Sequence, residues 1–167
     1  MADSSKKLIV FEPNKDNYGI LKGNISLNNL EEKVLSFDKA CGNVPGVLSL
    51  GGHALNSLFA ENSTQANSNY QVEIVVLDDF LKENGIDTGE ISFIKIDVEG
   101  FEYQVLKGLE KTLSDSDEIV VYLETHAKCN ADDTIDPKKD SESFLKSLGY
   151  TEKKRFDCDS CFWEKIA

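Results

Sequence analysis

Three carboxylates lie close together in the sequence: Asp97, Glu99 and Glu102 flank Gly100 in the segment Lys95-Ile-Asp-Val-Glu-Gly-Phe-Glu102. An apolar run precedes them and an amphipathic run follows, so we expect them at the end of a strand and the start of a helix. The glycine would let the backbone turn tightly there. Such carboxylates could accept a hydroxyl proton, bind a divalent cation or stabilise a positive charge, and the residue types leave all three roles open.

These residues also have a purely structural explanation. Acidic side chains in the first turn of a helix interact favourably with its dipole, typically by ~0.3–1 kcal/mol each. We favour a chemical role for Asp97 and Glu99 and leave both explanations open for Glu102. His126 ends another apolar segment and, with Glu124, could contact a substrate or act as a base.

The elements that must position these side chains are short apolar runs alternating with amphipathic segments. We expect strands at residues 8–11, 34–37, 71–77, 91–96 and 118–126, helices at 14–28, 78–84, 101–113 and 141–148, and a C-terminal hairpin at 150–156 and 162–166. Asn14 and either Asp78 or Asp79 are the expected helix caps. Residues 46–69 are rich in Gly, Ser and Asn and predict loops with one strand-like piece.

This alternation predicts the α/β fold class: a Rossmann-like, mostly parallel sheet with helices on both faces and a C-terminal antiparallel hairpin. Ligands bind beyond the carboxyl ends of the strands in such a sheet. Residues 1–167 would form a single domain, because 167 residues suit one compact unit.

The composition restricts the partners. A formal net charge of −12 disfavours binding to nucleic acid or to an anionic membrane surface through a broad basic patch. No apolar run is long enough for a membrane-spanning helix, and the first residues lack an apolar signal core, so we expect a cytoplasmic protein.

The four cysteines do not predict a disulfide framework. Cys158 and Cys161 form a single Cys-x-x-Cys pair in the expected hairpin turn, where a second pair or a histidine would be needed to complete a zinc site. We expect no metal there. A disulfide or a redox role remains open, although such redox pairs usually open a helix.

Three segments resemble the FkbM-type methyltransferases, a branch of the seven-stranded fold that uses S-adenosylmethionine. The segments are Phe11-Glu-Pro-Asn14 with the helix that follows it, Leu77-Asp-Asp79, and Phe93 through Gly108. The third is the most specific, and the likeness extends over nearly the whole chain. The resemblance implies S-adenosylmethionine as the cofactor, with a divalent metal as an open possibility.

The resemblance also implies roles for residues at the strand ends. Glu12 would accept hydrogen bonds from the ribose hydroxyls of the cofactor, although a helix-entry acid is the simpler explanation for an isolated glutamate. Asp38 and the backbone at Ala40 would contact the adenine, although Asp38 also suits an ordinary turn. Asp97 would lie at the cofactor's sulfonium and, with Glu99 and His126, at the reaction centre.

In one respect the chain departs from the family. The first strand and its glycine-rich turn should precede Lys7, and only six residues, most of them polar, do. That strand would lie between the strands at residues 8–11 and 91–96, so its loss would leave two unpaired edges. Either the two halves close on each other, another chain supplies the strand, or the domain is incomplete at its N-terminus; we favour the last.

Two functions follow as expectations. The first is an S-adenosylmethionine-dependent methyltransferase that O-methylates a sugar or another small hydroxylated metabolite. The alternative is a truncated, non-catalytic remnant of the fold that acts as an interaction module or is a gene fragment. The acceptor and the oligomeric state are beyond the sequence.

Overall fold

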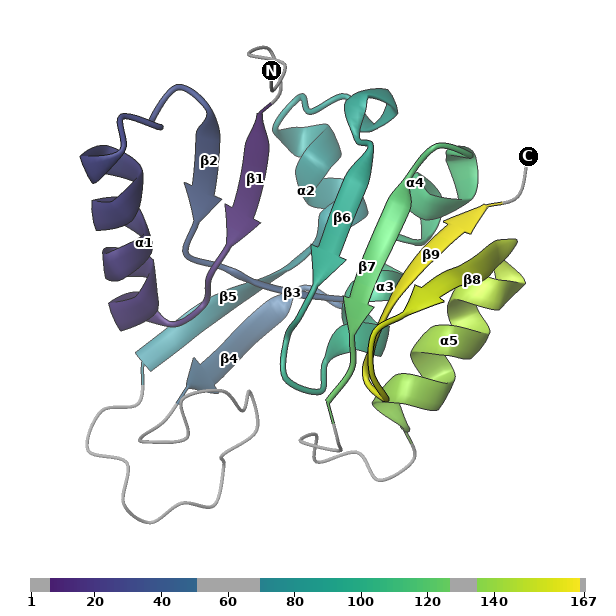
Figure 1. Ribbon diagram of the computed structural model, residues 1–167. Coiled ribbons are helices and arrows are strands. Elements are labelled where there is room, and N and C mark those ends of the chain that lie inside the picture. The colour runs from purple at the N-terminus through teal and green to yellow at the C-terminus, as the bar shows by residue number, and fades with distance from the viewer. Residues whose placement is uncertain (1–6, 51–69, 127–134, 166–167) are drawn as a thin grey trace.

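The computed structural model describes residues 7–50, 70–126 and 135–165. Its strands form three small sheets, with the orders β1-β2, β3-β5-β4 and β6-β7-β9-β8 (Figure 1). The pairs β1–β2, β3–β5 and β6–β7 are parallel, whereas β4–β5, β7–β9 and β8–β9 are antiparallel. The α/β class expected from the sequence is confirmed.

The N-terminal unit is a strand-helix-strand crossover. It contains β1 (Leu8–Phe11), α1 (Lys15–Leu27) and β2 (Val34–Phe37). Asn14 caps α1 as expected, because its side chain accepts hydrogen bonds from the backbone N–H groups of Asp16 and Asn17. This end of β1 is therefore followed at once by an ordered helix start.

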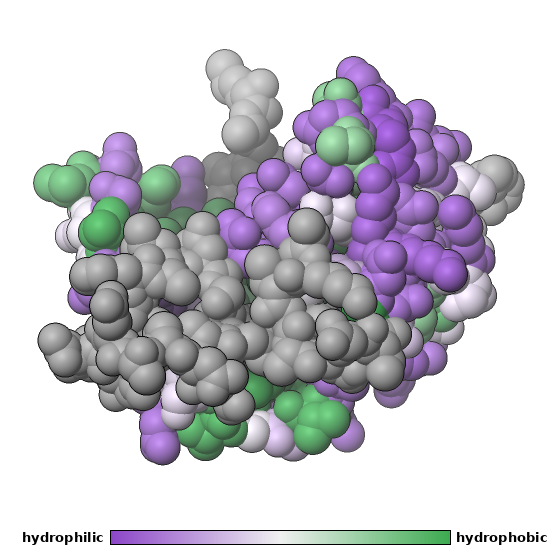
Figure 2. Space-filling view, turned by 90° about the horizontal axis from the view of Figure 1, so that it is seen from below, coloured by the Kyte–Doolittle hydropathy of each residue, from purple (hydrophilic) through white to green (hydrophobic). Residues whose placement is uncertain are grey.

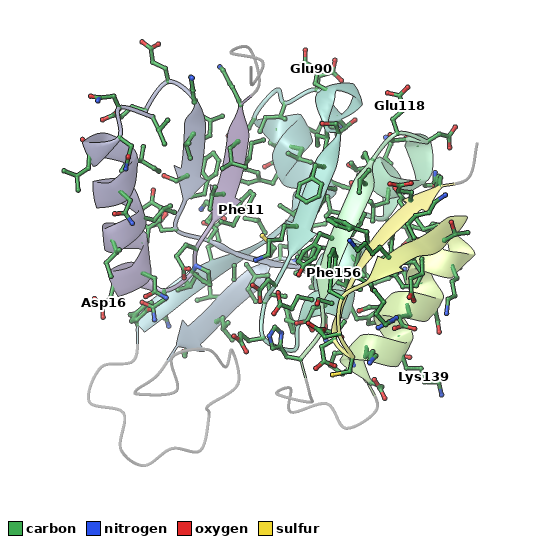
Figure 3. All side chains as sticks on the ribbon, viewed as in Figure 1. Phe11, Asp16, Glu90, Glu118, Lys139 and Phe156 are labelled. Carbon is green, nitrogen blue, oxygen red and sulfur yellow. The ribbon has the colours of Figure 1, made fainter. Side chains whose placement is uncertain are left out.

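An aromatic contact joins this unit to the rest of the molecule. The ring of Phe11 lies 5.4 Å from that of Phe37 and 5.2 Å from that of Phe80, centre to centre. Phe11 points from β1 toward the middle of the molecule (Figure 3). These rings pack the β1-β2 sheet against α2.

The middle unit contains β3 (Ala40–Gly42), β4 (Gly46–Leu50), β5 (Tyr70–Val76) and α2 (Leu77–Glu83). The expectation that Asp78 or Asp79 caps α2 is wrong, since the N-cap is Val76, without a side-chain hydrogen bond. Asp78 instead accepts hydrogen bonds from the backbone N–H groups of Lys111 and Thr112 and from the Thr112 hydroxyl. It thus caps a different helix, 34 residues away in the sequence.

The four-stranded sheet holds the core. A short 3₁₀ turn, η1 (Thr88–Glu90), leads into the sheet. Its strands are β6 (Phe93–Ile96), β7 (Val120–Glu124), β8 (Tyr150–Arg155) and β9 (Ser160–Lys165), and the helices that pack on it are α3 (Glu102–Gly108), α4 (Glu110–Asp115) and α5 (Pro137–Ser147). Leu106, Leu113, Val121, Leu123 and Trp163 are fully buried between them. The predicted hairpin is confirmed, with β9 lying between β7 and β8.

The opposite face of this sheet is aromatic and half exposed. Tyr122, Phe156 and Phe162 pack edge to face or tilted, with ring centres 5.1–6.2 Å apart. Phe93 joins Phe162 and is 53% exposed. The strand alternation therefore divides the sheet into a buried aliphatic face and an accessible aromatic one.

The single helix expected over residues 101–113 is divided into α3 and α4 at Leu109. The division coincides with a close approach of two backbones. A Cβ atom on Gly108 would lie 2.2 Å from the carbonyl oxygen of Gly42 in β3. Gly108 therefore lets α3 contact β3, an approach that periodicity along one helix does not reveal.

In the described residues, no backbone hydrogen-bond ladder joins β1 to β6. Among the described residues, β1 pairs only with β2, and β6 forms its strand pair only with β7. Both strands run in the same direction (Figure 1). Direct closure of the two halves, one of the three solutions expected from the sequence, is therefore not observed in the described part of the chain.

The surface is polar on the side that carries β8, β9 and α5. Seen from below, hydrophilic residues cover most of this side, with a small hydrophobic patch among them, and further hydrophobic patches lie elsewhere (Figure 2). Glu152, Lys153 and Lys154 of β8 are among the exposed charged residues. In the described residues, no helix combines the length and the hydropathy needed to span a bilayer.

Candidate active site

The carboxyl ends of the parallel strands carry the residues singled out from the sequence. Glu12 follows β1, Asp38 follows β2, Asp97 follows β6, and His126 lies two residues beyond β7. The four strands point the same way (Figure 1), so these residues are at the same edge of the molecule. This is the edge at which open α/β sheets bind ligands.

The backbone after β6 turns sharply. Glu99 has a φ of 56° and Gly100 a φ of 101°. The sequence predicted the tight turn at Gly100, but not the left-handed conformation of Glu99, which costs a non-glycine residue roughly 1–2 kcal/mol. The strained turn is consistent with a functional loop.

His126 faces three carboxylates. Its Nε2 atom lies 3.8 Å from Asp97 Oδ1 and 3.8 Å from Glu99 Oε2, which is too long for a direct hydrogen bond. Its Nδ1 atom lies 3.1 Å from Glu102 Oε1. The fold thus brings together all three residues expected at the reaction centre, and adds Glu102 as a direct neighbour of the imidazole.

Glu102 is the buried member of this group. Its side chain is fully buried, and Oε1 also accepts a hydrogen bond from the backbone N–H of Gly100 at 2.9 Å. The sequence left its role open between chemistry and helix stabilisation. Burial was the missing information, because a first-turn glutamate that only interacts with the helix dipole can remain in solvent.

Lys95 supplies the one positive charge seen beside the cluster in the described residues. Its ammonium group donates a hydrogen bond to Asp97 Oδ2 at 3.0 Å. This hydrogen bond raises the pKa of Lys95. Lys95 and Asp97 are two residues apart, and side chains at that spacing share one face of a strand, a signal by which the pair could have been found.

The surroundings of His126 shift its protonation equilibrium. Partial burial of the ring lowers its pKa, but the hydrogen bond to Glu102 and the charges of Glu99, Glu102 and Asp97 outweigh that effect. The net result is a pKa above the ordinary value for histidine. His126 is therefore a stronger base than a free imidazole, and loses its proton at a higher pH.

The same atoms could hold a cation. Asp97, Glu99 and His126 each offer one ligand atom, and the three atoms lie within 4.8 Å of one another. Carboxylate oxygens and an imidazole nitrogen suit several divalent metals. Exposed acidic groups are often this close without a metal, so proximity alone identifies no ion.

At the other end of the edge, Glu12 is partly buried. Its Oε1 accepts a hydrogen bond from the backbone N–H of Asn14 at 2.8 Å, which is the helix-entry contact weighed from the sequence. A carboxylate has a second oxygen with which to accept a ribose hydroxyl. Tyr70 lies nearby and accepts a hydrogen bond from the backbone N–H of Lys15, a neighbour that the sequence did not indicate.

Asp38 and Ala40 lie at the start of the middle unit. Asp38 is exposed, whereas Ala40, backbone and side chain together, is only 3% exposed at the start of β3. The adenine contact expected at the Ala40 backbone would therefore have little accessible surface, whereas Asp38 is open to solvent. Glu12, Asp38 and Ala40 thus remain candidates for cofactor binding, and they differ in how much of each residue is accessible.

The Cys-x-x-Cys pair is reduced in this structure. Cys158 is exposed and Cys161 is buried, and both are free thiols. Cys161 Sγ accepts a hydrogen bond from the indole N–H of Trp163, so it belongs to the core of the hairpin.

Comparison with known proteins identifies a family. The sequence model of a protein family, the methyltransferase FkbM domain, matches residues 1–151. A solved structure, the methyltransferase FkbM from Methylobacillus flagellatus KT, aligns with a TM-score of 0.59 and 17% sequence identity, and the alignment covers 95% of this chain. The chain spans 36% of that protein's chain, and at this identity the likeness shows the fold alone. No curated protein matches.

Proposed function

The chain belongs to the FkbM methyltransferase family, and from that premise we propose that it transfers a methyl group from S-adenosylmethionine to a hydroxyl of a sugar or another small metabolite. The observation that supports an O-directed reaction is His126, which faces Asp97 and Glu99 at the carboxyl edge of the sheet. A base at this position can accept the proton that a hydroxyl must lose.

The cofactor, when bound, supplies a methyl group that is already activated by a positively charged sulfur. Transfer of that methyl group to the acceptor oxygen would leave the electron pair of the carbon–sulfur bond on sulfur. The acceptor's proton passes to His126 Nε2. Asp97 and Glu99 stabilise the positive charge that enters with the cofactor and orient the acceptor hydroxyl.

Glu12 is the residue proposed to hold the cofactor's ribose. A carboxylate at the end of a parallel strand can accept hydrogen bonds from two vicinal hydroxyls. Asp38 and the backbone at Ala40 would lie at the adenine. The observation in favour of this assignment is that β1, β2 and β6 present their carboxyl ends at the same edge (Figure 1).

Calorimetric titration tests cofactor binding. S-adenosylmethionine and its demethylated product should each bind the chain, and Glu12→Gln should weaken both. Asp16→Asn is a matched control, since Asp16 is an exposed carboxylate at the start of α1 (Figure 3) and its loss should leave affinity unchanged. Absence of heat and of thermal stabilisation at millimolar ligand would contradict the enzyme function for this chain.

The alternative function, a non-catalytic interaction module, is favoured by one observation. The described residues leave β1 and β6 without a second strand partner, and unpaired edges are templates for strand addition. The same titration separates the two functions, because an interaction module has no need to bind S-adenosylmethionine.

A further inference from the structure

The contact between Glu102 and His126 is the best-defined interaction at the carboxyl edge. The two residues come from different elements, Glu102 from the first turn of α3 and His126 from the segment after β7. Their side chains meet at 3.1 Å, and the glutamate is fully buried whereas the imidazole is 27% exposed. The arrangement places a buried carboxylate behind an accessible ring.

This contact determines which ring nitrogen carries a proton. An ionised carboxylate only accepts hydrogen bonds, so Nδ1 must donate to Glu102 Oε1. In the neutral ring, the lone pair is then on Nε2, the atom that faces Asp97 and Glu99 at 3.8 Å. The nitrogen available to a substrate is therefore the basic one.

We propose that Glu102 is a positioning residue, which holds the imidazole of His126 in the tautomer and orientation that leave Nε2 free to accept the acceptor's proton. The inference rests on the proposed function, because it assumes that His126 is the base. It adds a residue to the reaction centre that is separated from His126 by 24 positions in the sequence.

A helix-capping role alone does not explain Glu102. Its contact with the Gly100 N–H uses Oε1, and a neutral glutamine oxygen could accept that bond equally well. Burying a carboxylate is costly unless its charge is compensated, and in the described residues its second oxygen, Oε2, has no hydrogen-bond partner. The imidazole at Oε1 adds a second donor to this buried carboxylate and so offsets part of that cost.

The protonation of His126 has several contributors, and the test must separate them. The groups that face the ring in the described residues are Asp97 and Glu99 from the loop after β6 and Glu102 from α3. Lys95 is bound to Asp97 on the other oxygen. In the described residues only Glu102 contacts Nδ1, so its replacement removes the acceptor that holds the proton on that nitrogen, whereas Asp97 and Glu99 act on Nε2.

Nitrogen-detected NMR of the imidazoles tests the proposal without any enzymatic assay. The chain has two histidines, His53 and His126, and a His53→Gln variant assigns the signals. In the unmodified protein with EDTA present, neutral His126 should carry its proton on Nδ1. Glu102→Gln should lower the pKa of His126 and redistribute the proton between the two nitrogens, while the His53 signals stay unchanged.

Glu118→Gln is the matched control. Glu118 is exposed and lies at the opposite edge of the molecule, near the start of β7 (Figure 3). The substitution therefore removes one negative charge, as Glu102→Gln does, at a site that does not contact His126. A proton on Nε2 in the unmodified protein, or equal effects of the two substitutions, would overturn the proposal. The position of the proton in the unmodified protein tests the proposal even if Glu102→Gln fails to fold.

Enzyme kinetics then test whether the contact between Glu102 and His126 affects the reaction. Glu102→Gln should lower kcat by at least about 10-fold, a fraction of the roughly 10²–10⁴-fold that a positioned base contributes, with KM for both substrates nearly unchanged. The pH at which kcat rises with the deprotonation of His126 should also move to a lower value, because the hydrogen bond that raises the pKa of His126 is removed. If the NMR result is as expected and the unmodified protein methylates no hydroxylated acceptor, the positioning contact stands and the proposed function fails.

Discussion

At the scale of single residues, the chemistry of this chain depends on environment more than on residue type. Glu99 and Glu102 are both glutamates of one loop and helix start, but Glu99 is partly exposed in a left-handed backbone conformation and Glu102 is fully buried. Each faces a different nitrogen of His126. The burial and the direction of each carboxylate, not its identity, separate the two roles.

The raised pKa of His126 has a consequence for stability. A group whose pKa is higher in the folded state stabilises the fold below its unfolded pKa, near 6.5, and this contribution disappears as the pH rises through the folded value. His126→Gln should therefore be less stable than the unmodified protein at about pH 5.5, and the difference should shrink above neutral pH. Urea denaturation of both proteins across this range measures it, and a difference independent of pH would contradict the assignment.

At the scale of elements, close contacts between distant segments determine where helices begin and end. Asp78 of α2 accepts hydrogen bonds from the start of α4, and Gly108 at the end of α3 lies against Gly42 of β3. Both residues belong to the segments that resemble the family. Their positions explain physically why an acid and a glycine stand there.

The contact at Gly108 yields a stability prediction. Gly108→Ala places a methyl group 2.2 Å from the Gly42 carbonyl oxygen, so the free energy of unfolding should fall by about 1–3 kcal/mol, as for other overpacked sites. Gly23→Ala is the control, because nothing lies within 4 Å of a Cβ there in α1 and alanine favours a helix. Chemical denaturation compares the two, and equal stability of both variants would show that β3 and α3 do not touch.

At the scale of the whole molecule, the described residues form three sheets instead of one continuous sheet. The aromatic trio of Phe11, Phe37 and Phe80 holds the N-terminal unit by side-chain packing, not by strand pairing with β6. In the described residues, the backbone groups of β1 and β6 that face away from β2 and β7 therefore belong to no strand ladder.

Hydrogen exchange tests this arrangement. The amides of β7, which is paired with β6 and β9, should exchange slowest, and the outward amides of β1 and β6 should exchange much faster. After exchange in deuterated water, proteolysis and mass spectrometry measure the deuterium taken up by each of these segments. Equal protection of β6 and β7 would mean that another strand covers the edge.

The sequence by itself determined the strands at 8–11 and 34–37, the cap at Asn14, the C-terminal hairpin and the family, because periodicity, turn residues and motifs are local properties. It also identified Asp97, Glu99 and His126 as residues that end or follow strands. Only the tertiary structure decided that Glu102 is buried against His126, that Asp78 caps α4, that Gly108 meets Gly42 and that, in the described residues, β1 and β6 do not pair with each other. These contacts join segments far apart in the chain, and their geometry depends on how the elements pack.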